Sequence, residues 1–396
     1  MKKLCLLLLA CVLCGIAGAK RYTVIVSLDG FRWDYTEMYN TPWLDSIARC
    51  GVKAVMQPSF PSSTFPNHYT LATGLVPDHH GIIANKFRDF KSGLTFSLGD
   101  KTTKSDPRFW GGEPIWSTAM RQGMKVGVVY WPGSDVKIGG HFPTYYKDYE
   151  VKPLLTFSQR IAEIDRLLTL PEKDRPSLVM AYFDQPDHDG HSYGPHDKRV
   201  RRTVETMDML MGQLWSDLRS LPIRDSVNLI VTADHGMTSV GDDRLIHPYD
   251  YVKKEWVNYI SYDLPTLIEP VKGYEDSVYN ALRNVPHLRV WRKKDVPAYL
   301  HYGSNPNVTS IVVLPDLGWT VTGWKHQRLH GTHGFDPTYS DMHVMFRAVG
   351  PDFKRGYTEH RLFTNTDVYP LLCHLLGIAP AKNDGSLDGV SLMLAH

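Results

Sequence analysis

The stretch YTVIVSLDG (22–30) is a run of mostly apolar residues that closes on an acidic residue, Asp29. Three further runs share this texture: MKVGVVYW (124–131), SLVMAYFD (177–184) and VNLIVTADHG (227–236). All four are rich in β-branched residues and lack two-residue alternation, a pattern typical of strands buried on both faces of a parallel sheet. The sequence therefore predicts a central, mostly parallel sheet.

A helix is predicted between the last two of these strands. Its apolar residues recur every three or four positions, as they do in a helix with one buried face. These residues are Val200, Val204, Met207, Met211, Leu214, Leu218 and Leu221. Strands that alternate with helices indicate an α/β fold, and such folds place their functional side chains at the carboxyl ends of the strands.

The pattern of apolar and polar residues changes between residues 248 and 325. Short stretches such as LRVWRKK and TSIVVLP surround one helical stretch, EDSVYNALRNV, which predicts a small α+β lobe of short alternating strands. The α/β pattern resumes near His326 and ends in the helical run VYPLLCHLLG (368–377). We therefore predict a catalytic α/β domain made of residues 20–247 and 326–396, with residues 248–325 inserted as the lobe.

The first 19 residues have the features of a cleavable secretory signal. Lys2 and Lys3 precede an apolar run, and a small-residue cleavage site ends at Ala19. A poor lipoprotein-like match at Cys11 leaves a retained anchor as the alternative. Cleavage takes the formal charge from +2 to 0, so we do not expect binding of a nucleic acid polymer through counterion release. The prediction is an exported protein, periplasmic or secreted.

Two cysteines, Cys50 and Cys373, remain after such a cleavage. They could pair in an oxidising compartment, but their separation in the sequence favours two unpaired core residues. A disulfide-rich scaffold is not indicated. The sequence contains no second apolar run of the length needed to span a bilayer, and it does not specify an oligomeric state.

Acidic and imidazole residues gather at the predicted carboxyl ends of the strands. Each could by itself be a capping or turn residue, but independent capping would not place three aspartates at three strand ends with histidines nearby. Carboxylate oxygens and imidazole nitrogens suit borderline divalent metals such as zinc. The candidate ligands are Asp29, Asp187, His191, Asp234, His235 and His333.

The segment SFPSSTFPNHYTLATG (59–74) places Thr64 at the start of a predicted short helix. Backbone N–H groups at a helix start lack partners within the helix and stabilise negative groups. A hydroxyl at this position is either a plain N-cap or a nucleophile whose product is an anion. The segment alone leaves both interpretations open.

In this order the chain contains the motifs SLDGFR, FPSSTFPNHYTLATG, GIIANKF, WGGEPIW, WPGSD, PDHDGHSYGP, TADHGM and GTHGFD. They resemble the motifs of the nucleotide pyrophosphatase/phosphodiesterase family, within the alkaline-phosphatase-like superfamily. The resemblance runs from residue 22 to the C-terminus. It implies an alkaline-phosphatase-like α/β fold, with a mostly parallel central sheet flanked by helices and a small α+β cap lobe.

The resemblance also implies two Zn²⁺ per subunit. One zinc would be bound by Asp187, His191 and His333. The second would be bound by Asp29, Asp234 and His235, with the Thr64 oxygen as fourth ligand. Thr64 would then be the nucleophile, since coordination to zinc makes its alkoxide accessible. Asn85 would donate a hydrogen bond to a phosphoryl oxygen, as would backbone N–H groups at the helix start.

Three aromatic residues match positions that line the nucleoside pocket in nucleotide-cleaving members. They are Phe65, Tyr149 and Tyr182, and a base stacks favourably on such rings. The alternative for these rings is a place in the core. The stretch YWPGSDVKIGGHFP (130–143) also resembles a loop of nucleotide-hydrolysing members.

The implied activity is that of a secreted zinc-dependent phosphodiesterase/pyrophosphatase. It would hydrolyse nucleotide phosphodiesters and pyrophosphates to nucleoside monophosphates through a phospho-threonyl intermediate. One alternative is a choline-type phosphodiesterase acting on glycerophosphocholine or lysophospholipids. A second, from another class, is a non-catalytic metal- or nucleotide-binding protein, although the intact nucleophile and ligand set argue against it.

Overall fold

The computed structural model describes residues 20–395, and its centre is a nine-stranded sheet with the strand order β18-β2-β17-β8-β1-β7-β5-β6 and β19 paired with β2. β1 (Tyr22–Leu28) lies between β7 (Leu178–Phe183) and β8 (Val227–Thr232) and is parallel to both. β17 (Val344–Val349) runs antiparallel to its neighbours β2 and β8. The prediction of a central, mostly parallel sheet is confirmed.

The remaining strands of this sheet are shorter or lie nearer its edges. They are β2 (Val52–Gln57), β5 (Val126–Val129), β6 (Tyr145–Lys147), β18 (Tyr357–Thr358) and β19 (Phe363–Thr364). A separate hairpin is formed by β3 (Lys86–Arg88) and β4 (Thr95–Ser97).

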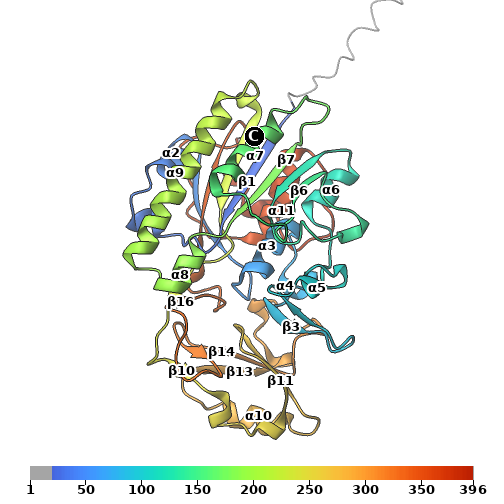
Figure 1. Ribbon diagram of the computed structural model, residues 1–396, viewed down its shortest axis with the longest axis vertical. Helices are drawn as coiled ribbons and strands as arrows, with labels where there is room; N and C mark the ends of the chain where they lie inside the picture. The colour runs from blue at the N-terminus through green and yellow to red at the C-terminus, as the bar shows by residue number, and fades with distance from the viewer. Residues whose placement is uncertain (1–19, 396) are drawn as a thin grey trace, which may run out of the picture.

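Helices cover both faces of the sheet (Figure 1). One layer contains α2 (Pro42–Cys50), α7 (Phe157–Leu168) and α9 (Lys198–Ser220), and α9 contacts the other two. The other contains α3 (Thr64–Thr73), α6 (Ile115–Arg121) and α11 (Val368–Leu376). The shorter helices are α1 (Tyr35–Met38), α4 (Pro77–His80), α5 (Lys101–Lys104) and α8 (Asp187–Tyr193).

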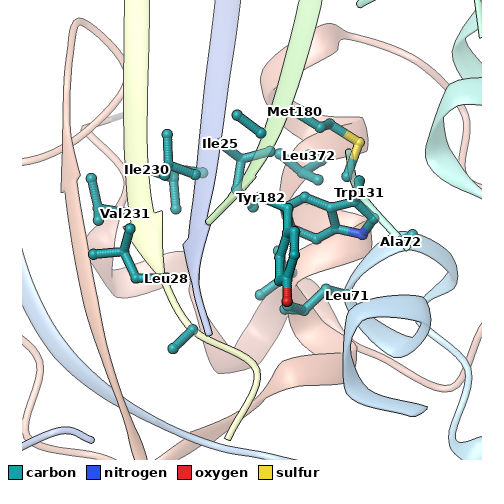
Figure 2. Close-up of a cluster of buried hydrophobic side chains, with 14 of the residues drawn as sticks. Ile25, Leu28, Leu71, Ala72, Trp131, Met180, Tyr182, Ile230, Val231 and Leu372 are labelled. Atoms are coloured by element: carbon teal, nitrogen blue, oxygen red, sulfur yellow. The ribbon is translucent and has the colours of Figure 1, made fainter. Parts of the chain in front are cut away.

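The long predicted helix is confirmed as α9, and the apolar residues that predicted it are buried. The predicted C-terminal helix is confirmed as α11. On the other face of the sheet, Ile25 of β1 and Met180 of β7 pack with Trp131 and with Leu372 of α11 (Figure 2). This buried layer fixes the strands between the helices, so the carboxyl edge of the sheet is a rigid support.

The segment 248–325 contains a second, four-stranded antiparallel sheet, which lies at the bottom of Figure 1. Its strands are β11 (Val257–Ser261), β12 (Thr266–Pro270), β14 (Ile311–Pro315) and β13 (Leu288–Arg292), in that order, and α10 (Glu275–Leu282) packs on it. The domain boundaries at 248 and 325 stay a prediction.

The expected alternation of these strands is wrong for β14, which is buried along its whole length. Val312 and Leu314 belong to the main hydrophobic core, whereas Ile311 and Val313 belong to a second cluster that contains Val278 of α10. Both faces of the strand are therefore covered, one by the main body and one by α10. A strand covered on both faces has no reason to alternate apolar and polar residues.

Both cysteines among the described residues are free. Cys373 is buried, as expected, but the prediction of a core position is wrong for Cys50, which is exposed at the last residue of α2. The predicted signal segment 1–19, with the alternative at Cys11, lies outside the described residues. Between residues 20 and 395, no helix combines the length and the hydropathy that crossing a membrane requires.

We expect the substitution Ile25→Ala to lower the free energy of unfolding by about 2–5 kcal/mol, because it leaves a cavity in a fully buried layer. Val151→Ala, at a side chain that is 62% exposed, is the control and should change stability by less than about 0.5 kcal/mol. Denaturant unfolding of both variants measures the difference. Equal effects would contradict the placement of Ile25 in the core.

Candidate active site

Four segments that are distant in the sequence meet at the carboxyl edge of the central sheet. Asp29 directly follows β1, and Asp234 and His235 follow β8. α8, which follows β7, begins at Asp187. His333 follows β16 (Gly331–Thr332), which pairs with β9 (Thr238–Ser239) just after the Asp234 loop.

Local geometry aims these side chains at one another. Asp187 and His191 lie four residues apart on α8 and therefore on one face of that helix. Gly30, with φ +68°, lets the loop after Asp29 approach α8 closely, since a Cβ at this position would lie 2.9 Å from Asp187 Cα. The sheet thus brings Asp29 and Asp187 together through backbone packing.

Thr64 is the first residue of α3, and the N-cap residue is Ser63. The hydroxyl of Thr64 does not cap the helix: its Oγ1 lies 3.1 Å from Nε2 of His235. Of the two interpretations left open by the sequence, the plain N-cap is therefore excluded.

Each of the three histidines is anchored through Nδ1 to a backbone carbonyl. His191 donates to the Gly331 oxygen at 2.8 Å and His235 to the Gly236 oxygen at 2.8 Å. His333 donates to the Ser62 oxygen at 3.0 Å. Because a carbonyl only accepts hydrogen bonds, these contacts place a proton on Nδ1, so that Nε2 carries the lone pair in the neutral ring. This arrangement is common for metal-binding histidines.

The free nitrogens and the carboxylates converge in two adjoining groups. In the first, Nε2 of His333 lies 3.2 Å from Nε2 of His191, which lies 3.4 Å from Asp187 Oδ2. In the second, Nε2 of His235 lies 3.3 Å from Asp29 Oδ1 and 3.0 Å from Asp234 Oδ2. Lone pairs that face one another at these distances repel, unless a cation lies between them.

The donor set fits a metal by a further criterion. Asp29 Oδ1, Asp187 Oδ1 and Asp234 Oδ2 are buried without a hydrogen-bond partner among residues 20–395. Buried carboxylate oxygens left unpaired are costly and rare. Three such oxygens beside three imidazole nitrogens match the oxygen and nitrogen ligands that zinc takes in proteins.

The pKa shifts of the candidate ligands also reflect the close packing of ionisable groups at this site. Burial, with repulsion from Asp234 and Asp187, raises the pKa of Asp29 well above its ordinary value. Burial and the neighbouring His235 and His191 lower the pKa of His333 well below its ordinary value. Burial also opposes ionisation of Asp234, but its pKa is lowered because His235 and His68 outweigh that effect.

The first predicted ligand set, Asp187, His191 and His333, forms one geometric group. The second group differs in part from the predicted set, since ligand atoms of Asp29, Asp187 and His235 lie within 4.8 Å of one another. Asp234 joins this group through its contact with His235. Asp187 therefore stands between the two groups, an arrangement that the sequence did not predict.

A cavity of about 300 Å³ adjoins the ligand groups. It is lined by Thr64 and by all the predicted substrate-binding residues, namely Phe65, Asn85, Tyr149 and Tyr182. Asn85 Oδ1 accepts the backbone N–H of Phe65 at 3.0 Å. The expectation that the amides of the helix start face a phosphoryl oxygen is therefore wrong for Phe65. The same contact turns the Nδ2 amide of Asn85 into the available donor beside Thr64.

Tyr182 combines the two interpretations that the sequence left open. Its side chain lines the cavity but is only 8% exposed, and its hydroxyl donates to Asp29 Oδ2 at 2.6 Å. Burial and the Asp29 carboxylate raise the pKa of Tyr182, which keeps the hydroxyl protonated as a donor. Tyr149 lies beside it with a ring-centroid separation of 6.3 Å, and Phe65 packs near Trp110 at 6.0 Å.

The sequence analysis missed His68, which is fully buried behind Thr64. Its Nδ1 lies 2.9 Å from the backbone oxygen of Thr64 and 3.3 Å from Asp234 Oδ2, and its Nε2 lies 2.9 Å from Ser27 Oγ. The spacing of four residues from Thr64 places it one helical turn away. That spacing was the signal in the sequence that could have identified it.

The sequence analysis also missed part of the cavity wall. Lys104, which is buried and paired with Glu150, lines the cavity, and so does Lys147. Tyr130 does as well, and its φ of +64° is unusual for a residue other than glycine. No local motif marks these residues, because distant segments bring them together.

Comparison with known proteins points to the same family as the sequence motifs. The model of the family "Type I phosphodiesterase / nucleotide pyrophosphatase" matches residues 23–336. Ectonucleotide pyrophosphatase/phosphodiesterase family member 5 of Homo sapiens is 38% identical over 375 residues, which cover 94% of this chain and 77% of the human protein. Member 3 of Bos taurus is 36% identical over 390 residues, covering 94% of this chain.

This chain spans less than half the length of the bovine relative, 44%. A solved structure of murine member 5, an inactive threonine-to-alanine variant in complex with AMP, superposes with a TM-score of 0.89. The two are 37% identical, and the superposition covers 95% of this chain and all of the murine one.

We expect His68→Ala to lower the affinity for Zn²⁺ by about 10- to 100-fold, because Asp234 loses a neighbour that orients it. The control is His80→Ala, a fully buried histidine that contacts Thr70 and Pro66 rather than a candidate ligand. Competition titration with a zinc chelator measures both variants. An equal loss of affinity in His80→Ala would contradict a specific role for His68.

Proposed function

Because the chain belongs to the type I phosphodiesterase / nucleotide pyrophosphatase family, with its alkaline-phosphatase-like α/β fold, we propose that it is a nucleotide phosphodiesterase/pyrophosphatase. It hydrolyses nucleotide phosphodiesters and pyrophosphates to nucleoside monophosphates. The observation that carries this proposal is the position of the Thr64 hydroxyl. It lies 3.1 Å from Nε2 of His235 on one side and borders the aromatic-lined cavity on the other.

We propose two Zn²⁺ as the resident cations. Asp187, His191 and His333 would hold one. Asp29, Asp234 and His235, with the Thr64 oxygen, would hold the other. When bound, such ions act as Lewis acids that favour the alkoxide of the nucleophile and stabilise charge on the oxygens of an in-line displacement.

The residues of the chain then have distinct parts in the first step. Thr64 Oγ1 loses its proton and forms a bond to phosphorus, while the bond from phosphorus to the leaving oxygen breaks on the side away from Thr64. The balancing proton ends on the departing group. The Nδ2 amide of Asn85, free beside Thr64, donates to a non-bridging oxygen as charge develops there. The nucleoside phosphate stays attached to Thr64 as a phosphodiester, and the alcohol or phosphate group departs.

The second step releases the product. Water attacks the phosphorus of phospho-Thr64, the bond to Oγ1 breaks, and the threonine hydroxyl regains a proton as the nucleoside monophosphate forms. His68 holds the first turn of α3 through the Thr64 backbone oxygen, which keeps Oγ1 in place during both displacements. Tyr182 holds Asp29 in its orientation through the 2.6 Å hydrogen bond.

The cavity supports a nucleoside substituent rather than a choline one. Its volume of about 300 Å³ lies within the range of small-molecule pockets, so the preference for a nucleoside comes from the residues of its wall. Phe65 and Tyr149 offer ring faces on which a base can stack. The loop that resembles nucleotide-hydrolysing members contributes Trp131, Pro132, Ser134 and Asp135 to the same wall. Ser134 lines the cavity, and its Oγ has no hydrogen-bond partner among the described residues.

The relatives support the substrate class. Their names describe ectonucleotide pyrophosphatases/phosphodiesterases, and the murine structure of an inactive threonine variant contains AMP. We extend this substrate class to the present chain as part of the proposal. Export, with residues 1–19 as the signal and a periplasmic or secreted product, also belongs to the proposal.

Thr64→Ala should lower kcat for p-nitrophenyl-TMP by about 10³-fold or more, because no other hydroxyl occupies its position. The zinc content should stay at two per chain, since the aspartate and histidine ligands are unchanged. Thr64→Ser is the matched control and should keep much of the activity. Steady-state kinetics with metal analysis by mass spectrometry checks both results. Normal turnover by Thr64→Ala would exclude the covalent route.

The ratio of kcat/KM for p-nitrophenyl-TMP to that for p-nitrophenylphosphorylcholine should exceed about tenfold, because one base–aromatic stack contributes about 1–3 kcal/mol. Tyr149→Ala should reduce this ratio. Tyr146→Ala, an exposed neighbour that does not line the cavity, should leave it unchanged. A preference for the choline ester would show that the enzyme is a choline-type phosphodiesterase instead.

A further inference from the structure

The edge of the central sheet opposite the active site carries two hollows. The first, of about 550 Å³, lies where β1, β5 and β7 begin, since Arg21, Lys125 and Ser177 line it. The second, of about 870 Å³, is lined by Val227 at the start of β8 and Val349 at the end of the antiparallel β17. The two hollows adjoin, because Asp352 lines the first and its neighbours Pro351 and Phe353 line the second.

Basic residues dominate both hollows. The first is lined by Lys20, Arg21, Lys125, Lys173 and Arg175. The second is lined by Arg49, Arg219, Arg224, Lys354 and Arg355. Only three carboxylates line the hollows, in addition to these ten cations. They are Glu172 and Asp352 in the first hollow and Asp225 in the second. The residues that line the two hollows therefore carry a surplus of seven positive charges.

Most of these cations are not neutralised by ion pairs. Arg21 pairs with Asp352 at 3.0 Å and Lys125 with Asp174 at 2.7 Å, and Arg224 is 3.9 Å from Asp225. The other cations have no carboxylate within 4.0 Å in the described part of the chain. Four of them lie over aromatic rings instead, namely Lys20, Arg175, Arg219 and Lys354. Four of the five cations of the second hollow are exposed to solvent.

This concentration of charge is unexpected for a chain whose residues 20–396 are neutral overall. The ten cations come from segments between residues 20 and 355, and no basic run joins them in the sequence. The rest of the molecule balances the surplus and is therefore net acidic. The protein has an electrostatic polarity, with its positive end at the amino edge of the strands.

We propose that this basic face binds the surface of an anionic phospholipid bilayer. The cations are spread over the starts of several strands, the last turns of α2 and α9 and the segment after β17, rather than along one groove. This distribution matches a charged plane better than a single polymer chain. Both ends of the described chain lie on the same face, since Lys20 lines the first hollow and Ala395 the second. In Figure 1 both ends lie at the top, far from the lobe.

This orientation has a consequence for access to the site. The carboxyl ends of β1, β7 and β8, which carry Asp29, Asp187 and Asp234, point away from the basic face. A protein bound to a bilayer through its basic face would therefore keep the candidate active site open to solutes. Binding of this kind is electrostatic, so it weakens as salt shortens the range of the interaction.

The test is co-sedimentation of the purified protein with vesicles of phosphatidylcholine and phosphatidylglycerol at a ratio of about 3:1, in low salt. We expect binding to these vesicles, little binding to pure phosphatidylcholine vesicles, and release in about 0.5 M salt. The double variant Arg219→Glu/Arg355→Glu should lower the partition coefficient by about 30-fold or more. Both residues are exposed, and unchanged hydrolysis of p-nitrophenyl-TMP in solution reports that the variant folds.

The matched control is Lys272→Glu/Arg283→Glu, which makes the same charge change at two exposed positions that flank α10 of the lobe. It should bind vesicles like the unmodified protein. Equal losses in the two double variants, or no binding of the unmodified protein to anionic vesicles, would overturn the proposal. Binding to heparin or DNA in place of vesicles would also overturn it, in favour of a soluble polyanion.

Discussion

Repulsion among three carboxylates, two of them buried and one half-buried, is the constraint on which the architecture of the site depends. Asp29 and Asp234 are buried at one edge of the sheet, and the half-buried Asp187 lies beside them. Burial together with the neighbouring charges raises the pKa of Asp29. Such a cluster does not assemble by its own attraction. It is held by the parallel pairing of β1 with β7 and β8, and by the close backbone approach at Gly30. The stability of the hydrophobic layers thus holds together a site whose carboxylates repel one another until cations bind.

The groups around the ligands prepare them for that role. Three backbone carbonyls fix the imidazole rings, from Gly331, Gly236 and Ser62, and each directs one Nε2 inward. Tyr182 fixes one oxygen of Asp29, and the Gly30 amide fixes one oxygen of Asp234 at 3.2 Å. In both aspartates the second oxygen is left without a hydrogen bond among residues 20–395. Orienting contacts of this kind reduce the cost of reorganisation when a metal or a substrate binds.

The molecule places its candidate metal ligands and its basic residues at opposite edges of the central sheet. Carboxylates and imidazoles gather at the carboxyl edge of the strands, and lysines and arginines gather at the amino edge. The small lobe packs on the main body through Val312 and Leu314, so its sheet shares the main hydrophobic core. The cavity next to Thr64 draws its wall from segments as far apart as Phe65, Tyr149 and His333.

The sequence alone determined the α/β class, the four buried strands, the long helix α9 and the candidate ligands, because each is written in a local pattern of apolar residues or in a short motif. The sequence did not determine which side chains and backbone groups contact one another in the folded chain. The position of Asp187 between two ligand groups, the Phe65 amide taken by Asn85, the exposure of Cys50 and the coverage of β14 all follow from contacts between distant segments. His68 had a signal in its helical spacing, but its contact with Asp234 depends on how α3 packs against the end of β8. Local patterns encode which face of an element is buried, whereas only tertiary packing decides what that face meets.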